Sequence, residues 1–320
     1  MKISILIPTY CRTKDLEACL EALKKQVRVP DQVVVTVRDT DTQTQDFLAV
    51  YDKGALPLES VSVTQEGVVA AMNRGLENVS GEIVALIDDD TTPWEDWLQR
   101  IDAHFASDPK LGGVGGRDWH PQERWDNPTV GKIEWFGRVI GNHHVGVGPP
   151  REVDLLKGAN CAYRAAALKE IGFDTRLRGR GAQVHWELSL AFAMKKRGWK
   201  LVYDPQISLD HHVGVRLDED QLHRNGYHAL ALENAVYNET IILLENFTPT
   251  RRAAFLTWGA LIGTKGDPGL LQLVRLLLKR DKNAISRLQA TRKGRADAVR
   301  FLANAKHHPA SDKAPESKIP

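Results

Sequence analysis

Three consecutive carboxylates, Asp88, Asp89 and Asp90, follow directly on the apolar run of residues 83–87. That run is rich in β-branched residues, which predicts a buried strand. Three like charges so close together raise one another's cost of ionisation. A hard divalent cation such as Mg²⁺ or Mn²⁺ removes that cost, and it commonly takes phosphate oxygens as further ligands. The cluster therefore predicts a metal and nucleotide-phosphate site, with a solvated acidic turn as the alternative.

The elements that position these carboxylates alternate between strand and helix over residues 1 to about 110. Such alternation predicts a parallel sheet with crossover helices, and ligands bind at the carboxyl ends of the strands in such sheets. Thr9, Asp39 and the Asp cluster each stand at one of those ends. Thr13 is expected to cap the first helix. The predicted strands are residues 2–7, 33–37, 60–63 and 83–87, and the predicted helices are residues 13–26 and 67–76.

Composition narrows the class of protein. The chain has 320 residues, of which 42% are hydrophobic and 26% charged, as is ordinary for a globular protein. A formal net charge of +2 argues against a dedicated nucleic-acid binder. The three cysteines show no metal-ligand spacing, which favours a reducing compartment. The first apolar run is too short for a signal peptide, and no stretch approaches the roughly 20 residues of a membrane span. We therefore expect a cytoplasmic protein.

The order of the motifs resembles the family 2 glycosyltransferases, the inverting group with the GT-A fold. The similarity covers residues 1 to about 215. Its pieces are the opening segment 5–12, Asp39, the Ala-Ala-Met-Asn-Arg-Gly segment 70–75, the Asp cluster, the segment 158–164, and the segment 187–198 with Pro205 and His211. Each piece is unspecific by itself, whereas six in this order and spacing are typical of the family.

The resemblance implies an α/β fold of the GT-A nucleotide-diphospho-sugar transferase type, Rossmann-like, with a mostly parallel central sheet flanked by helices. We expect a catalytic domain over residues 1–215, with a nucleotide-binding half (1–110) and an acceptor-binding half (111–215). A helical C-terminal extension would follow over residues 216–305, and residues 306–320 are expected to be disordered. The implied reaction moves a sugar from a nucleotide-sugar donor to a hydroxyl acceptor with inversion, assisted by a divalent metal (Mn²⁺ or Mg²⁺).

The same resemblance assigns roles to individual residues. Asp88 would face the ribose, Asp90 would bind the metal, and Asp89 would support either role. Asp39 would hydrogen-bond the base, with Asp41 as a weaker choice. His211 would complete the metal shell, with adjacent His212 as the alternative, and Asp210 could orient either ring. The remaining residues expected at the nucleotide sugar are Pro8, Thr9, Tyr10 and Arg12 of the first turn, and Asn73 and Arg74, which could equally be packing and capping residues.

Inverting transfer needs one general base for the proton of the acceptor hydroxyl. The family places an acidic pair eleven residues before a glycine, and counting back from Gly198 gives Glu187, preceded by Trp186. Both positions depart from the usual Glu-Asp or Asp-Asp pair. Glu187 is favoured as the base, and His185, which titrates near neutral pH, is the rival. A first-turn glutamate that only favours the helix dipole is the structural alternative.

The C-terminal third places basic residues between leucines, from residue 270 to residue 300. Basic amphipathic helices bind anionic membrane surfaces, and family 2 enzymes often use lipid-linked acceptors, so a peripheral contact at the inner membrane face is one interpretation. Packing against the catalytic domain is the other. Two rival functions also stay open: a nucleotidyltransferase, which would need an early Gly-rich loop with a basic residue, and a catalytically impaired protein that only binds a glycan or partner.

Overall fold

The computed structural model describes residues 1–120, 125–212 and 227–307, with no side chains described for 305–307. Within these ranges a nine-stranded sheet has the order β3-β2-β1-β4-β10-β6-β11-β5, and β9 pairs with β11. Its strands are β1 (Ile3–Thr9), β2 (Gln32–Arg38), β3 (Leu58–Val63), β4 (Ile83–Ile87), β5 (Thr91–Pro93), β6 (Leu111–Trp119), β9 (Arg151–Glu152), β10 (Asn160–Arg164) and β11 (Lys200–His211).

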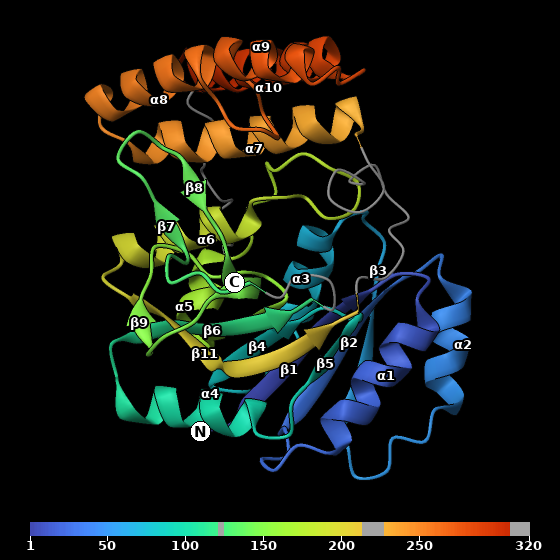
Figure 1. Cartoon of the computed structure of the whole chain (residues 1–320). Helices are drawn as coiled ribbons and strands as arrows, with labels where there is room; N and C mark the ends of the chain where they lie inside the picture. Colours follow the sequence, from blue (N-terminus) through green and yellow to red (C-terminus); the bar gives the residue numbers. More distant parts are fainter. Residues whose placement is uncertain (121–124, 213–226, 308–320) are drawn as a thin grey trace, which may run out of the picture.

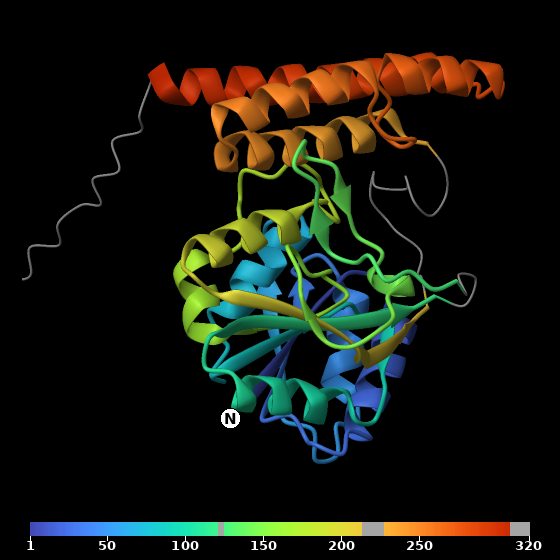
Figure 2. The same ribbon diagram turned by 60° about the vertical axis from the view of Figure 1, so that its left-hand side comes forward.

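Helices cover both faces of this sheet, and four more form a separate layer (Figures 1 and 2). The helices of the sheet domain are α1 (Thr13–Lys24), α2 (Thr42–Val50), α3 (Val68–Leu76), α4 (Trp97–Ser107), α5 (Ala165–Ile171) and α6 (Trp186–Lys196). The C-terminal helices are α7 (Ala229–Asn246), α8 (Pro249–Leu261), α9 (Leu270–Leu278) and α10 (Ala284–His307). A small hairpin, β7 (Lys132–Ile133) with β8 (Val139–Ile140), and a 3-10 turn (His143–Val145) lie between β6 and β9.

Alternation along the strands divides the core in two. Ile3, Ile5 and Ile7 of β1 pack with α1 and α4, whereas Leu6 packs on the other face with residues of α3, α5 and α6. Successive side chains of a strand point to opposite faces, so one strand supplies both cores. Strands buried on both faces read as continuous apolar runs, as β4 does.

The topology agrees with the predicted GT-A fold. Strands β3, β2, β1 and β4 are parallel neighbours, and β6 pairs in parallel with β11. The second half adds antiparallel pairs, because β10 lies between β4 and β6 and runs against both. Four of the predicted strands and both predicted helices are present, each within about two residues of its expected ends.

Three details differ from the expectations. Arg12, and not Thr13, occupies the N-cap of α1, and it makes no side-chain capping bond. Helix α2, which was not predicted, begins at Thr42 because Asp41 caps it. Its sequence lacks the regular spacing of apolar residues that predicts a helix. The long helix α10 continues to His307, two residues into the tail expected to be disordered. The predicted boundary near residue 215 and the tail from residue 308 lie outside the described residues.

Helix α7 lies between the sheet domain and the outer helices α8, α9 and α10 (Figures 1 and 2). Its buried residues Tyr237, Ile241 and Leu244 belong to the same core as Leu6 and Met72 of the sheet domain. The extension is therefore packed on the sheet domain. No described helix is long and apolar enough to cross a bilayer.

Candidate active site

The Asp cluster lies at the carboxyl end of β4, beside the end of β1. Thr9 Oγ1 donates to Asp89 Oδ2 at 2.7 Å, which joins the two strand ends. Arg12, at the start of α1, forms ion pairs with Asp89 and with Asp90, the latter at 3.1 Å. Asp89 and Asp90 are buried, and Asp88 is partly exposed. Arg12 thus compensates part of the charge that three carboxylates bring together.

The charges in this cluster shift one another's pKa. Burial raises the pKa of Asp89 to about 7, and Asp90 and Asp88 add to the shift, although the guanidinium of Arg12 opposes it. Burial would lower the pKa of Arg12, but the carboxylates of Asp89 and Asp90 raise it. The cluster thus brings three carboxylates beside one guanidinium, an arrangement that favours binding of a further cation.

Register brings His211 to the same place. Strand β5 starts immediately after the Asp cluster and pairs with the end of β11, so that Thr91 lies opposite His211. His211 Nε2 lies 3.3 Å from Asp90 Oδ1. The neighbouring His212 points to the other face, where its Nε2 is 2.8 Å from Thr92 Oγ1. Alternation along the strand therefore directs only one of the two imidazoles at the Asp cluster.

Asp118 is a second buried carboxylate at this site, on β6. His211 Nδ1 lies 3.5 Å from Asp118 Oδ2, His120 Nε2 lies 3.0 Å from the same oxygen, and Lys157 forms an ion pair with it. Burial would raise the pKa of Asp118, but Lys157 and the two imidazoles hold it well below its usual range. Burial likewise would lower the pKa of His211, but Asp118 and Asp90 raise it to about 9.

Two groups of described side chains have the spacing of metal ligands: Asp88, Asp90 and His211, and Asp118, His120 and His211. In each group the ligand atoms lie within 4.8 Å of one another. Each group includes a carboxylate in contact with a cation, Asp118 with Lys157 in the second group and Asp90 with Arg12 in the first. The first group fits Mn²⁺ or Mg²⁺ better, with two carboxylates, one imidazole and a partly open side at Asp88.

Glu187 lies on the first turn of α6. Its Oε1 accepts a hydrogen bond from the backbone N–H of Gly158 at 3.2 Å. Burial raises the pKa of Glu187; the N–H groups of Glu187 and Gly158 oppose the shift, and the charge of Asp88 adds to it. Because Asp88 and Lys157 both act on its pKa, Glu187 lies within electrostatic range of the Asp cluster and of the Asp118 group.

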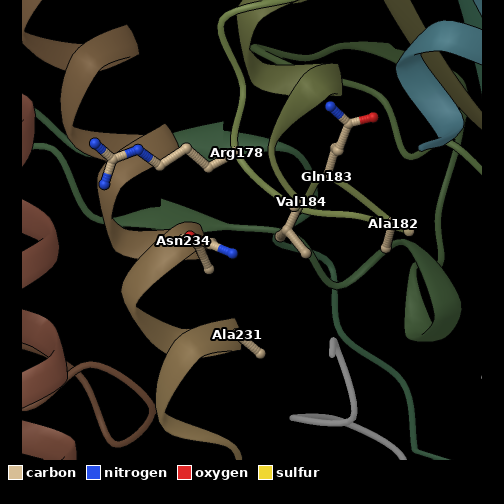
Figure 3. Close-up of a pocket in the computed structure, with 9 residues that line it drawn as sticks. Arg178, Ala182, Gln183, Val184, Ala231 and Asn234 are labelled. Atoms are coloured by element: carbon tan, nitrogen blue, oxygen red, sulfur yellow. The ribbon is translucent and has the colours of Figure 1, made fainter. Parts of the chain in front are cut away.

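The loop before α6 is held from two sides. Gln183 Oε1 accepts from the N–H of Val69 on α3, and the buried Asn238 of α7 donates to the carbonyls of Arg178 and Val184. Figure 3 shows this loop and α7 on opposite walls of a small pocket, with Val184 and Gln183 from the loop and Ala231 and Asn234 from the helix. His185 follows in the left-handed region, with a φ of 77°. The base candidates therefore stand on a braced segment.

The other predicted nucleotide residues are spread around the same strand ends. Pro8 and Thr9 end β1, which lies beside the end of β2, where Asp39 is exposed. Tyr10 is exposed in the following turn. Asp41, the weaker choice for the base contact, is buried and used as the N-cap of α2, where its Oδ1 accepts from the N–H of Thr44.

Asn73 and Arg74, on α3, make contacts outside the Asp cluster. The Asn73 amide donates to the carbonyl and accepts from the N–H of Phe173, both at 2.9 Å. Arg74 is exposed and pairs with Glu77. Asp210 lies near the Trp94 indole, which donates to it at 3.2 Å. Asp118, and not Asp210, therefore lies next to the His211 ring.

Sequence reasoning missed Asp118, His120 and Lys157 as members of the site. The Asp-x-His pair at the end of a strand was the available signal, because residues two apart on a strand share one face. The strand itself was not predicted, because the glycines between residues 112 and 116 lack the side chains that would form an apolar strand pattern. Lys157 carried no signal beyond its place before Gly158.

The sequence matches a family of glycosyltransferases and individual members of known activity. The model of Glycosyl transferase family 2 matches residues 4–172. A glucosyl-dolichyl phosphate glucuronosyltransferase of Haloferax volcanii is 25% identical over 224 residues, 66% of this chain and 69% of that protein. A poly-beta-1,6-N-acetyl-D-glucosamine synthase of Staphylococcus epidermidis is 24% identical over 196 residues, which are 59% of this chain and only 46% of the synthase.

Solved structures show the same fold. The mannosyltransferase PcManGT from Pyrobaculum calidifontis, in complex with GDP-Man and Mn²⁺, superposes with a TM-score of 0.53 at 18% identity, covering 98% of this chain and 88% of that one. S. aureus TarS 1–349 in complex with UDP-GlcNAc gives a TM-score of 0.56 at 16% identity, covering 97% and 92%. The family match spans more than half of the chain, and the protein belongs to glycosyl transferase family 2, with a GT-A fold and a helical C-terminal layer.

Proposed function

We propose that the protein transfers a sugar from a nucleotide-sugar donor to a hydroxyl group of an acceptor, with inversion and with Mn²⁺ or Mg²⁺. The observation that carries this proposal is the convergence of Asp88, Asp90 and His211 at the end of β4, with ligand atoms within 4.8 Å of one another. Glu187 stands within electrostatic range of that group. A metal site for a diphosphate and a carboxylate for the acceptor are the two parts that the reaction needs.

The donor would lie over the carboxyl ends of β1, β2 and β4. Asp39 would hydrogen-bond the base, Asp88 would lie between the ribose and the metal, and the turn from Pro8 through Thr9 and Tyr10 would contact the nucleoside. Arg12 holds Asp89 and Asp90 in place and brings positive charge near the phosphates. Asn73 and Arg74 support this half from α3, since Asn73 fixes the backbone at Phe173. The relatives bound to GDP-Man and UDP-GlcNAc support a nucleotide-sugar donor.

Asp88, Asp90 and His211 would hold the metal. When bound, the metal neutralises the negative charge that develops on the departing nucleoside diphosphate. Asp118 orients the His211 ring by accepting from Nδ1, which leaves Nε2 directed at the Asp90 side as a ligand. Lys157 balances the charge of Asp118, so that Asp118 stays ionised.

Glu187 would act on the acceptor. Its carboxylate takes the hydroxyl proton while the acceptor oxygen forms a bond to the sugar carbon and the bond from that carbon to the diphosphate breaks on the opposite side. A pKa raised by burial makes a carboxylate a better proton acceptor. The base must be ionised, so turnover should fall as the pH drops through that raised pKa.

The acceptor proposed is a glycan or a lipid-linked hydroxyl. One curated relative is named for a glucosyl-dolichyl phosphate, which supports a lipid-linked acceptor. Another is named as a synthase of poly-beta-1,6-N-acetyl-D-glucosamine, which supports a glycan acceptor. A lipid-linked acceptor places the enzyme at a membrane surface, and we propose a cytoplasmic, peripheral location at the inner face.

One alternative keeps support from a specific observation. Trp186 and Glu187 stand where the family usually has two acids, and Trp186 is buried against Phe173. A protein with an impaired base would bind donor and glycan without turnover. Nucleotidyl transfer is not favoured, because the turn from Pro8 to Arg12 carries no glycine-rich loop.

The experiment first identifies the donor. UDP-, GDP- and dTDP-sugars with Mn²⁺ are compared by thermal shift, because a ligand that binds only the folded state raises the Tm. Turnover of the donor that binds is then measured for the wild type, Glu187→Gln and His185→Asn. Asparagine tolerates the left-handed backbone at His185.

We expect Glu187→Gln to lower turnover by about a hundred- to ten-thousand-fold with donor affinity little changed, and His185→Asn to cost less. The wild type should also lose turnover below the pKa of Glu187. An inactive His185 variant beside a nearly normal Glu187 variant would reverse the two roles. Binding of the donor without any turnover in the wild type would favour the impaired alternative.

A further inference from the structure

Helix α9 carries an exposed apolar stripe. Leu270, Leu271, Val274, Leu277 and Leu278 are between 49% and 80% exposed, although Leu276 of the same helix is buried. At 3.6 residues per turn the five exposed side chains fall within an arc of about 120°. We call these five residues the α9 stripe. A contiguous apolar face of this kind is unfavourable in water and marks an interaction surface.

Exposed apolar side chains also stand at both ends of α9. Leu261 and Ile262, at the end of α8, are exposed, and the N–H of Gly269 donates to the carbonyl of Ile262, which places them beside the start of α9. Ile285 is 60% exposed at the start of α10. The apolar surface thus continues past the helix in both directions.

Positive charge borders the stripe. Arg275 and Lys279 follow it around the helix on the side away from Leu273, and Lys265, Arg280 and Lys282 are exposed in the adjoining segments. Within the described residues none of these five cations is in an ion pair. The two acids of the same region are both engaged, Asp267 with Arg295 at 3.6 Å and Asp281 with Arg287 at 3.5 Å.

The basic residues of α10 behave differently. Lys293 pairs with Glu233, Arg300 pairs with Asp297, and Arg295 is buried and donates to the carbonyl of Gly259. These side chains stabilise the packing of the helical layer. Arg292 of α10 is the exception, exposed and without an ion pair among the described residues, and most of the other unpaired cations of the helical layer lie around α9.

We infer that α9 binds flat on an anionic lipid surface, with the α9 stripe inserted between the headgroups and the bordering cations on the lipid phosphates. An amphipathic helix with a wide apolar face and basic flanks binds in this way, and nine residues are too few to cross a bilayer. Helix α9 belongs to the outer layer, on the side of α7 away from the sheet (Figures 1 and 2). The inference rests on the proposed membrane location and does not depend on sugar transfer.

Charge decides between lipid and a second copy of the chain. A two-fold contact through the α9 stripe would bring the same five cations of two copies together, and like charges across an interface oppose association. An anionic bilayer supplies both apolar chains and negative charge.

The test measures binding of the full-length protein to vesicles of phosphatidylcholine alone or with phosphatidylglycerol, by co-sedimentation at low and high salt. Two variants address the surface, Leu271→Gln with Leu278→Gln, and Arg275→Gln with Lys279→Gln. The matched controls lie on the sheet domain: Val27→Gln with Val50→Gln removes equally exposed apolar groups, and Lys53→Gln with Lys196→Gln removes exposed cations. Light scattering gives the oligomeric state, and calorimetry gives the affinity for a nucleoside diphosphate with Mn²⁺.

We expect the wild type to bind the anionic vesicles and to be released by salt. The leucine variant should bind at least about tenfold more weakly, and the cation variant about fivefold more weakly for each charge removed. Both controls should bind like the wild type. A wild type that ignores anionic vesicles at low salt, or a leucine variant that binds as well as its control, would overturn the inference.

A dimer that the leucine substitutions dissociate would show that a second copy covers the surface, and would also overturn it. The nucleotide titration separates this inference from the proposed reaction. Vesicle binding without nucleotide affinity would leave the docking surface and remove the donor site, and nucleotide affinity without vesicle binding would do the reverse.

Discussion

Asp118 is the residue on which the polar groups around the Asp cluster converge. It is fully buried, and one of its oxygens meets His120, His211 and Lys157. The spacing from Asp118 through His211 to Asp90 is that of a carboxylate that orients a metal-binding imidazole. Asp118 would therefore act as a positioning residue, through His211.

We predict that Asp118→Asn lowers Mn²⁺ affinity by about 10- to 100-fold, because the imidazole loses the partner that fixes its tautomer and orientation. The measurement is Mn²⁺ titration followed by electron paramagnetic resonance. The matched control is Asp210→Asn, one residue before His211 but bonded to Trp94, which should bind Mn²⁺ normally. Unchanged affinity in the Asp118 variant would assign Asp118 a purely structural role.

At the residue scale, the sequence predicted the parts of the site that follow a strand end directly. Asp88, Asp90 and His211 converge because β4, β5 and β11 bring their ends together. Asp118 was not predicted because the strand that carries it contains four glycines, whose lack of side chains removes the apolar pattern of a strand. Tertiary packing fills that space instead, with Tyr163, Trp199 and backbone atoms against those glycines.

Helix α6 contacts the turn before strand β10 at Gly158. A Cβ atom built on Gly158 would overlap the Trp186 indole and lie 3.0 Å from Glu187 Oε1. Only glycine permits this approach, because the indole is held against Phe173 with ring centroids 5.4 Å apart. The N–H of Gly158 is also the donor that binds the Glu187 carboxylate. The two segments therefore fix the Glu187 carboxylate together.

We predict that Gly158→Ala lowers kcat by about tenfold or more while the affinity for a nucleoside diphosphate with Mn²⁺ changes little, since a displacement of about 1 Å at the reacting groups is enough for such a loss. Gly266→Ala, in the C-terminal helical layer, is the control for loss of a glycine, because a Cβ there would meet only Thr264 Oγ1, at 3.8 Å. Equal loss of nucleotide affinity and kcat would mean that the substitution disturbs the whole site.

The bracing of the loop before α6 belongs to the element scale as well. Asn238 bonds to Arg178 and Val184, residues 60 and 54 positions away along the chain. No local pattern in a helical segment distinguishes such an amide from a solvent-exposed one. A helical extension was predicted over residues 216–305, whereas the contact of α7 with the loop that leads to Glu187 could not be predicted.

The whole molecule contains a second group of buried charges, far from the Asp cluster, where α7, α10 and the segment before α9 meet. Burial raises the pKa of Glu239 to about 8, and the charge of Asp267 adds to the shift while Arg295 opposes it. Burial also raises the pKa of Asp267. Two carboxyl groups share one guanidinium here, so one of them stays protonated near neutral pH.

A carboxyl group whose pKa is higher in the folded state binds its proton more tightly there. The free energy of unfolding should therefore fall as the pH rises from the unfolded pKa, near 4.5, to about 8. We predict that Glu239→Gln raises the Tm at pH 8 to 9 and has little effect at pH 5. Differential scanning calorimetry at both pH values measures this. Glu233→Gln, earlier on α7 and paired with Lys293, is the control. A Glu239 variant that is less stable at pH 9 would show that the ionised carboxylate stabilises the fold.

The order of elements in the nucleotide-binding half was predictable, because strands buried on both faces and amphipathic helices have distinct periods in the sequence. The arrangement of strands in the second half, residues 111–215, was less predictable. Strand β10 lies between β4 and β6 in the sheet although it follows both along the chain, and β5, which follows β4 in the sequence, lies at the edge beyond β11. The helical layer was expected, but not its division into an inner helix and outer helices, since burial of α7 depends on packing of distant segments.

The central claim is a metal-dependent nucleotide site at the end of β4. Calorimetry of a nucleoside diphosphate, with and without Mn²⁺, tests it most directly in the wild type and in Asp90→Ala. Asp46→Ala, on the surface of α2, is the matched control for loss of an aspartate. We predict Mn²⁺-dependent binding in the wild type and the control, and loss of the Mn²⁺ dependence in Asp90→Ala with the Tm showing a folded protein. Binding that is the same in Asp90→Ala as in the wild type, or that ignores Mn²⁺ in both, would contradict the account.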